Sequence, residues 1–192
     1  MRAAVLDRFG GPEVLTLRVV PVPALDASEV LIALHTAGVG SWDADMREGW
    51  WPESGRPGFP LVLGTDGSGT VAAVGSRVRR FTPGEPVFVV PYLSCGQCSA
   101  CRKQRPNCCQ HLQVLGVHRD GALAQYVCVP GQFVYSARGV SLDDAAMIEF
   151  LAIGAHAVRR SGLRSDQRVL GCGSGPIGIA CALFSKQRGS EV

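Results

Sequence analysis

Five of the chain's eight cysteines lie in one short segment, CGQCSACRKQRPNCC, from Cys95 to Cys109. Four of them, Cys95, Cys98, Cys101 and Cys109, follow the spacing C-x2-C-x2-C-x7-C. Thiolates spaced in this way can surround one tetrahedral zinc ion, with Zn–S bonds of about 2.3 Å. Four sulfur ligands leave no open position for water or substrate, so this zinc ion would be structural rather than catalytic.

Other uses of closely spaced cysteines remain open. The spacing C-x2-C-x2-C also begins the ferredoxin pattern of iron–sulfur ligands, but there the next cysteine follows after three residues and precedes a proline. Here it follows after seven residues and precedes Gln110. Disulfides or unligated thiols are a further alternative, and Cys108 could compete with Cys109 as the fourth ligand. The spacing favours zinc.

A second pattern, GSGPIG, has the form G-x-G-x-x-G and lies between an apolar segment, RVLGC, and an expected helix. Gly173, Gly175 and Gly178 would allow a tight turn, close approach of a pyrophosphate and close packing of the helix. The helix N-terminus, with Pro176 and Ile177 in its first turn, would attract the phosphates. The alternative is an ordinary glycine turn. In this context the pattern predicts a dinucleotide site.

The cysteines and the glycine turn must be positioned by two different kinds of structure. The segments RAAVLD, VLTLRVV, EVLIALHTAG, GTVAAVG and PVFVVP are rich in apolar and β-branched residues and are separated by Gly and Pro turns. They predict an irregular, barrel-like β domain over residues 1–140. The cysteine lobe, residues 91–111, is an excursion from this domain, and GALAQYVCVP returns to it as a strand.

From Ser141 the pattern becomes helical. The segment SLDDAAMIEFLAIGAHAVRRSG has Ser141 as a candidate N-cap, acids in its first turn, arginines in its last and Gly162 beyond its end. It predicts one long helix. The strand RVLGC, the glycine turn and a second helix ending near Gly189 follow. Residues 141–192 are therefore expected to begin a second, α/β domain.

Composition and charge exclude several classes of protein. The hydrophobic content of 46% is ample for a packed core, and the net charge of +3 is slight. No apolar stretch approaches the roughly 18–20 residues that cross a bilayer, and the N-terminus lacks the apolar run of a signal peptide. Basic residues are scattered except in CRKQR. We therefore expect a cytoplasmic protein with no nucleic-acid or membrane partner.

The two motifs, in this order and at this separation, resemble the medium-chain dehydrogenase/reductase family, which includes zinc alcohol and polyol dehydrogenases. The resemblance extends to LGTDGSGTVAAVGSRVRRFTPGEPV, GVHRDGALAQYVCVP and AAMIEFLAIGAHAV and covers the whole chain. It implies a GroES-like catalytic domain with a structural zinc lobe, followed by the first strand and helix of a Rossmann domain that binds NAD or NADP. It also implies a small alcohol or carbonyl substrate and, usually, homo-oligomers.

A catalytic zinc ion is harder to reconcile with the residues. Family members that bind one usually take a Cys from A-G-[IV]-C-G-[ST]-D and a His from G-H-E. Here AGVGSWD has Gly40 in place of the Cys, and LGTD has Thr65 and Asp66 in place of His-Glu. Glu149 matches a position where polyol-type members place a Glu near or on the metal. A carboxylate in this apolar segment is otherwise explained by pairing with an Arg or a backbone group.

Two branches of the family are represented. RFGGPEVL and AGVGSWDADMREG resemble the zinc-independent quinone reductases, whereas RPNCCQHLQVLGVHRDGALAQYV resembles polyol and sugar-acid dehydrogenases. The latter resemblance implies an NAD(P)-dependent alcohol dehydrogenase. The alternatives are a metal-free quinone or enone reductase and a non-catalytic, zinc-stabilised fragment.

Three residues in or next to the two altered metal-ligand segments could take part in a metal-assisted or a metal-free reaction. With a metal, Ser41 or Asp43 would relay the proton. Without one, Ser41, Asp43 or Thr65 would polarise a carbonyl group. Hydrogen bonding in turns and caps is the ordinary alternative for each of them.

The chain is short for this family. Members run to roughly twice its length and need a parallel sheet of about six strands to complete the cofactor site. We therefore expect these residues to be an N-terminal portion that is not an active dehydrogenase by itself.

Overall fold

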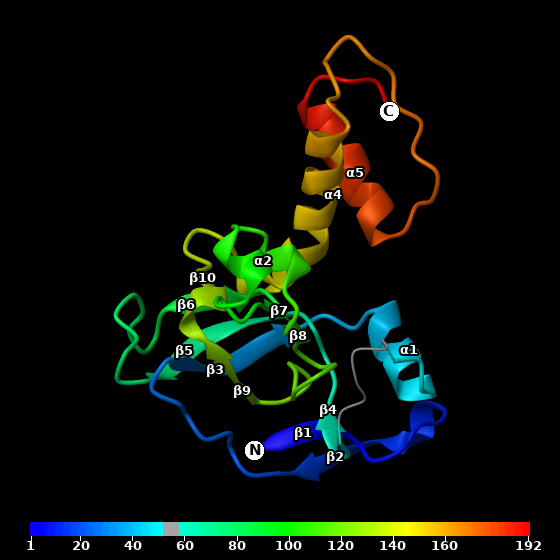
Figure 1. The fold of residues 1–192 in the computed structure, drawn as a ribbon. Helices are drawn as coiled ribbons and strands as arrows, with labels where there is room; N and C mark the ends of the chain where they lie inside the picture. The colour runs from blue at the N-terminus through cyan, green and yellow to red at the C-terminus, as the bar shows by residue number, and fades with distance from the viewer. Residues whose placement is uncertain (52–57) are drawn as a thin grey trace. The chain divides into compact units, whose positions relative to one another are not determined.

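The structure is a computed structural model that describes residues 1–51 and 58–192. The chain divides into two compact units, Met1–Ala146 and Met147–Val192. The first unit is built mainly of strands and the second mainly of helix, as can be followed in Figure 1. The boundary falls inside the segment that the sequence predicts as one long helix.

A five-stranded antiparallel sheet forms the centre of the first unit, in the order β10-β6-β5-β3-β9. Its strands are β3 (Glu29–Ala37), β5 (Gly67–Val74), β6 (Pro86–Val89), β9 (Tyr126–Pro130) and β10 (Val134–Ser136). Each strand places aliphatic side chains on the same buried face, because alternate residues of a strand point to the same side. Val30, Ile32, Val87, Val129 and Val134 are fully buried there and form the main core.

Two smaller sheets complete the first unit. One has the order β2-β1-β4 and comprises β1 (Arg2–Leu6), β2 (Leu15–Val19) and β4 (Leu61–Val62). The other pairs β7 (Tyr92–Leu93) with β8 (Gln113–Val114) at the base of the cysteine lobe. The irregular β domain expected from the sequence is confirmed, although the described strands form separate sheets and do not close a barrel.

Short helices lie between these strands. They are the 3-10 turns η1 (Pro12–Val14), η2 (Pro106–Cys108) and η3 (Gly131–Phe133) and the α-helices α1 (Ser41–Glu48) and α2 (Ser99–Arg102). The helix α1 is not among the predicted elements. Gly40 is its N-cap and Gly49 its C-cap, and the Gly49 φ of 103° is a left-handed conformation that favours glycine. Its Met46 is buried in a second core cluster with Leu6 and Leu63.

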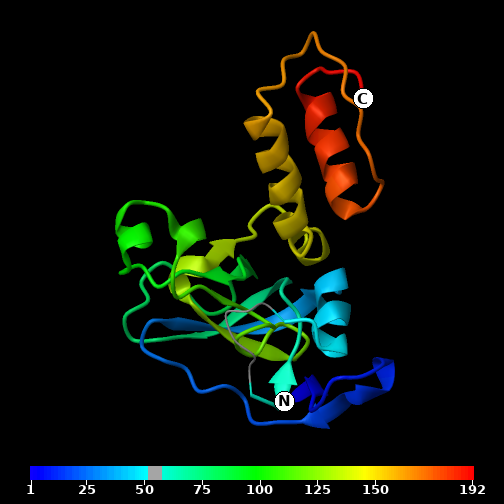
Figure 2. The ribbon, with the colours of Figure 1, turned by 45° about the vertical axis from the view of Figure 1, so that its right-hand side comes forward.

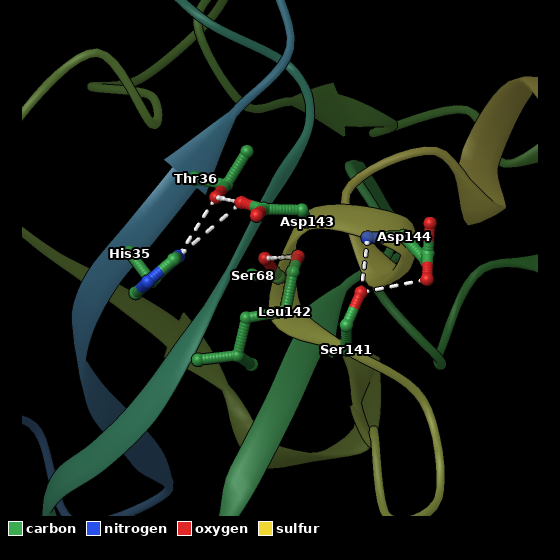
Figure 3. A network of polar contacts seen from close by, with 7 residues as sticks. All are labelled: His35, Thr36, Ser68, Ser141, Leu142, Asp143 and Asp144. Carbon is green, nitrogen blue, oxygen red and sulfur yellow. Dashed lines mark hydrogen bonds and ion pairs between the residues drawn. The ribbon is translucent and has the colours of Figure 1, made fainter.

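The helix α3 (Leu142–Ala145) is tied to two strands of the main sheet, as Figure 3 shows. The Thr36 hydroxyl of β3 donates to Asp143 Oδ1 at 2.5 Å, and the Ser68 hydroxyl of β5 donates to the Leu142 carbonyl. Ser141 caps the helix as predicted, since its Oγ accepts the Asp144 N–H at 3.0 Å. These bonds hold the last helix of the first unit on its sheet.

The second unit is a pair of packed helices, α4 (Ile148–Arg160) and α5 (Pro176–Gln187), which lie side by side in Figures 1 and 2. They approach closely at Gly154, where an added Cβ would lie 2.5 Å from the Ala180 Cβ. The prediction of one helix from Ser141 to the arginines is wrong. The chain forms α3 and α4 instead, because α3 is bonded to the first unit whereas α4 packs on α5.

The expected strand RVLGC is also absent from the second unit. In the described chain the segment has one bridge, between Arg168 and Glu191, and Val169 N–H donates to the Glu191 carbonyl at 2.8 Å. Leu170 is 95% exposed. A strand needs neighbouring strands for its N–H and C=O groups, and this segment has a single short neighbour.

Of the described helices, none has both the length and the apolar character needed to cross a membrane.

Candidate functional site

The cysteine lobe brings together the four residues selected by the spacing. The sulfur atoms of Cys95, Cys98, Cys101 and Cys109 all lie within 4.8 Å of one another, and Cys98 Sγ is 4.0 Å from Cys109 Sγ. In a tetrahedron with Zn–S bonds of about 2.3 Å the sulfurs are about 3.8 Å apart. The cluster therefore has nearly the dimensions of a zinc site.

Backbone N–H groups point at these sulfurs. Cys95 N–H donates to Cys109 Sγ at 3.3 Å, Cys98 N–H to Cys95 Sγ at 3.4 Å, and His111 N–H to Cys109 Sγ at 3.4 Å. Such bonds stabilise thiolates over thiols. The lobe is thus arranged for negatively charged sulfur.

The ionisation of the cluster is uneven. N–H groups of the Cys101 and Gln110 backbones lower the pKa of Cys98 to about 6. Burial and the neighbouring sulfurs raise the pKa of Cys101 to about 12. The four thiols cannot all ionise in so small a volume without a compensating cation, and a divalent metal deprotonates the thiols that it binds. Zinc fits this donor set.

The structure bears on two of the alternatives for the cysteines. The eight cysteines all lie in the described residues, and none of them forms a disulfide. Cys108 is exposed, accepts a hydrogen bond from Asn107 Nδ2 at 3.5 Å and lies outside the four-sulfur cluster. Geometry therefore places Cys109, rather than Cys108, with the other three ligands.

A second group of candidates lies where α1 meets the loop after β4. Asp43 is 7% exposed, and both of its carboxylate oxygens accept backbone N–H groups. Oδ2 accepts the Gly40 N–H at 2.8 Å, and Oδ1 accepts the buried Gly64 N–H at 2.9 Å. Burial raises the pKa of Asp43, against the opposing effect of these bonds. Asp43 thus joins the start of α1 to the loop, and we call this pair of bonds the Asp43 clamp.

Gly64 fits this loop because it has no side chain. Its φ is +101°, and an added Cβ would lie 2.8 Å from the Leu123 backbone N. Its carbonyl accepts the Ala122 N–H at 2.9 Å. The clamp and these contacts fix the position of Thr65, the next residue.

The remaining candidates of this face are less enclosed. Thr65 is half-buried, and its hydroxyl donates to Asp66 Oδ2 at 3.1 Å. Ser41 is exposed at the first position of α1. Aligning AGVGSWD with A-G-[IV]-C-G-[ST]-D puts Trp42, rather than Ser41, at the hydroxyl position of the pattern. Trp42 is 50% exposed and meets Trp50 edge to face, with ring centroids 5.5 Å apart.

Glu149 belongs to the second unit. It is half-buried in the first turn of α4, where the partial positive charge of the helix N-terminus favours a carboxylate. Its position in the first turn of α4 therefore explains an acidic residue here without a metal.

The glycine turn begins α5 as the motif requires. Gly173 has a φ of +101°, and Gly178 approaches it so closely that an added Cβ would lie 2.1 Å from the Gly173 carbonyl oxygen. Gly175 is the N-cap, and no side chain caps the helix. Pro176 occupies the first turn, and Ile177 is half-exposed. The N–H groups at this helix end have no side-chain cap, so water or an anion could accept them.

A cavity of about 780 Å³ adjoins this turn. Its walls come from the end of α4, the segment after it and the start of α5, including Val158, Leu163, Val169, Gly173 and Cys181. The glycine turn thus borders a mainly apolar hollow inside the second unit.

Comparison with known proteins identifies the fold family. Residues 26–139 match the family model described as the alcohol dehydrogenase GroES-like domain. The chain belongs to the medium-chain dehydrogenase/reductase family. The match lies within the β-rich first unit, beginning just before β3 and ending after β10.

Related sequences extend the match over almost the whole chain. L-galactonate-5-dehydrogenase of Escherichia coli K12 is 36% identical over 91% of this chain and 50% of its own length. Sorbitol dehydrogenase of Bacillus subtilis 168 is 34% identical over 99% of this chain and 54% of its own length. The chain therefore spans about half the length of these relatives.

Solved structures agree with this assignment. An NAD-dependent alcohol dehydrogenase superposes with a TM-score of 0.87 and 35% identity, covering 99% of this chain and 56% of that protein. The expected family and fold class are thus confirmed, apart from the strand RVLGC, which this structure does not form.

The Asp43 clamp was not predicted from the sequence. Asp43 is a candidate proton relay by its position in the motif, whereas in the structure both of its carboxylate oxygens accept backbone N–H groups. The local half of the clamp has a sequence signal, since an acid three residues after an N-cap is a capping pattern. Its other partner, Gly64, lies 21 residues away, and no local pattern reveals that contact.

Proposed function

We propose that this chain belongs to a cytoplasmic NAD(P)-dependent oxidoreductase that acts on the CH–OH group of a polyol or sugar acid. The observation that carries the proposal is a glycine-capped helix, α5, in the same chain as an alcohol dehydrogenase GroES-like domain. The similarity to L-galactonate-5-dehydrogenase and sorbitol dehydrogenase supports the substrate class.

Each motif has a defined part in this proposal. Cys95, Cys98, Cys101 and Cys109 would hold a structural zinc ion that stabilises the lobe and takes no part in the reaction. Gly173, Gly175 and Gly178, with Pro176 and Ile177, would hold the pyrophosphate of NAD or NADP. The nicotinamide, when bound, supplies the hydride acceptor.

Nucleotide binding tests the cofactor assignment. We expect NADH or NADPH to shift the backbone N–H resonances of residues 173–178 in an NMR titration of the chain. Gly175→Ala should weaken these shifts, because its Cβ meets no protein atom within 4 Å and would stand where a phosphate approaches. Gly171→Ala, also in open space, is the matched control. Absence of saturable shifts with both nucleotides would refute the assignment of the glycine turn as the pyrophosphate site.

A metal-free quinone or enone reductase is a second candidate, and one observation favours it. Gly40 and Thr65 provide neither thiolate nor imidazole where catalytic-zinc members have them. Trp42 lies in the first turn of α1, which Gly40 caps, and contacts Trp50, so these two indole groups offer a local signal. Saturable shifts of their indole N–H resonances with L-galactonate support the first candidate, and shifts with a conjugated enone alone support the second.

A further inference from the structure

The face formed by Gly40, Thr65 and Asp66 has an unsuitable donor set for zinc. Gly40 has no side chain, and the Thr65 hydroxyl is a neutral oxygen that already donates to Asp66 Oδ2 at 3.1 Å. Asp66 therefore offers carboxylate oxygen as the single charged donor among these three positions. Zinc sites in proteins are usually built from thiolate and imidazole, whereas oxygen donors suit harder cations.

Asp43 is a poor substitute for the missing ligands. Its two oxygens accept the Gly40 and Gly64 N–H groups at 2.8 and 2.9 Å. Each oxygen has a second lone pair, but a cation bound there would weaken the N–H bond to the same oxygen, and the Gly64 N–H is buried. The same clamp holds the start of α1 beside the loop after β4, so this arrangement needs no metal to hold it together.

Histidines do not complete the set. His35 Nδ1 lies 2.9 Å from Thr36 Oγ1 and 3.5 Å from Asp143 Oδ1, in the network that anchors α3 (Figure 3). His118 Nδ1 accepts the Val114 N–H at 3.1 Å, at β8. Within residues 1–51 and 58–192, a cluster of at least three His, Cys, Asp or Glu ligand atoms occurs at the four lobe cysteines alone.

We infer that this chain binds a single zinc ion, in the cysteine lobe, and that the Gly40–Thr65–Asp66 face works without a catalytic metal. The inference deepens the proposed function and rests on it for the identity of the reacting face. It holds for either candidate activity, because both place the substrate at this face. The substrate oxygen would then meet side-chain hydroxyl and carboxyl groups rather than a Lewis acid.

Metal content of the purified chain tests this inference directly. After growth with added zinc and removal of loosely bound metal, elemental analysis should give a zinc-to-chain ratio of one. Thr65→Ala and Asp66→Asn should leave this ratio at one, and Cys101→Ser should reduce it to near zero. A ratio of two or of zero, or a loss of zinc in Asp66→Asn, would overturn the inference.

Because Cys101→Ser removes a lobe ligand and can unfold the lobe, the deciding measurement uses the unaltered chain. Cobalt added to the metal-free, reduced chain should give sulfur-to-cobalt charge-transfer bands that saturate at one equivalent. A second saturable absorption phase, without sulfur character, would place a metal elsewhere and overturn the inference. That result would leave the nucleotide titration untouched, so failure here and failure of the proposed function are distinguishable.

Discussion

Removing the Asp43 carboxylate should destabilise the first unit, because this side chain joins α1 to the loop after β4. In Asp43→Ala, the buried Gly64 N–H loses its acceptor at 2.9 Å and the Gly40 N–H loses its acceptor at 2.8 Å. Gly40 is exposed, so water replaces the second bond. Gly64 is buried, and no water is expected to replace the first.

The magnitude follows from this difference. An unsatisfied buried N–H costs about 1–3 kcal/mol, and loss of a capping interaction at an exposed helix start costs about 1 kcal/mol. Removing the buried Asp43 carboxylate also removes its desolvation cost, which offsets a part of this loss of stability. We therefore expect Asp43→Ala to lower the free energy of unfolding by about 3 kcal/mol. Asp43→Asn should lower it by about 1 kcal/mol, since its amide oxygen can still accept the Gly64 N–H.

Urea unfolding followed by tryptophan fluorescence is a suitable assay, because Trp42, Trp50 and Trp51 report on α1 and its surroundings. Asp45→Ala is the matched control: Asp45 is exposed on the same helix, and its loss should change stability by less than about 0.5 kcal/mol. Hydrogen exchange of the Gly64 amide should accelerate in Asp43→Ala alone. Equal destabilisation by Asp43→Ala and Asp45→Ala would refute the clamp.

The same residue gives a pH dependence with a definite sign. Burial raises the pKa of Asp43 in the folded chain above its ordinary value of 3.8. The stability that this group contributes is therefore fully present below pH 3.8 and declines as pH rises through the folded-state pKa. The stability difference between the unaltered chain and Asp43→Asn should be larger at pH 4 than at pH 7. A difference that grows with pH would contradict the shift.

Three further predictions concern other parts of the chain. Gly154→Ala should destabilise the α4–α5 pair by about 1–3 kcal/mol in thermal unfolding followed by circular dichroism, because its Cβ would lie 2.5 Å from the Ala180 Cβ. Burial lowers the pKa of His118, so the stability that neutral His118 contributes should be lost as pH falls below 6.5. The urea midpoints of the unaltered chain and of His118→Gln should therefore become more similar as the pH is lowered below 6.5. Cys101→Ser should abolish stabilisation by zinc in a melting assay, whereas Cys108→Ser should retain it.

Features encoded by nearby residues were predictable from the sequence. The four lobe cysteines lie within one short segment, so their spacing alone limits which sulfurs can meet. The strands β3 and β5 are rich in apolar and β-branched residues and lie between turns, which indicates strands before any partner is known. The turn from Gly173 to Gly178 needs glycines for its own local geometry. In each case the physical cause lies within a few residues of the effect.

Features that depend on distant contacts were not predictable in the same way. The helix α1 has a polar sequence, SWDADMRE, with no continuous apolar stripe, and its stability comes from the Asp43 clamp and the burial of Met46. The helix α3 ends just before α4 and is bonded to β5 through Ser68 and the Leu142 carbonyl, which lie 74 residues apart in the sequence. Helix propensity continues through Ala146, but tertiary hydrogen bonds decide where the helix divides.

The second unit shows what a local pattern cannot supply. RVLGC has the composition of a buried strand, yet Leu170 is 95% exposed and Arg168 alone forms a bridge. Ile177, Ile179 and Leu183 of α5 are also exposed, while Ala180 packs against α4. The segment and the helix thus present apolar side chains that two helices cannot bury. Strand formation at RVLGC therefore requires hydrogen-bonding neighbours on its edges, whereas the glycine turn, whose geometry is internal, forms without them.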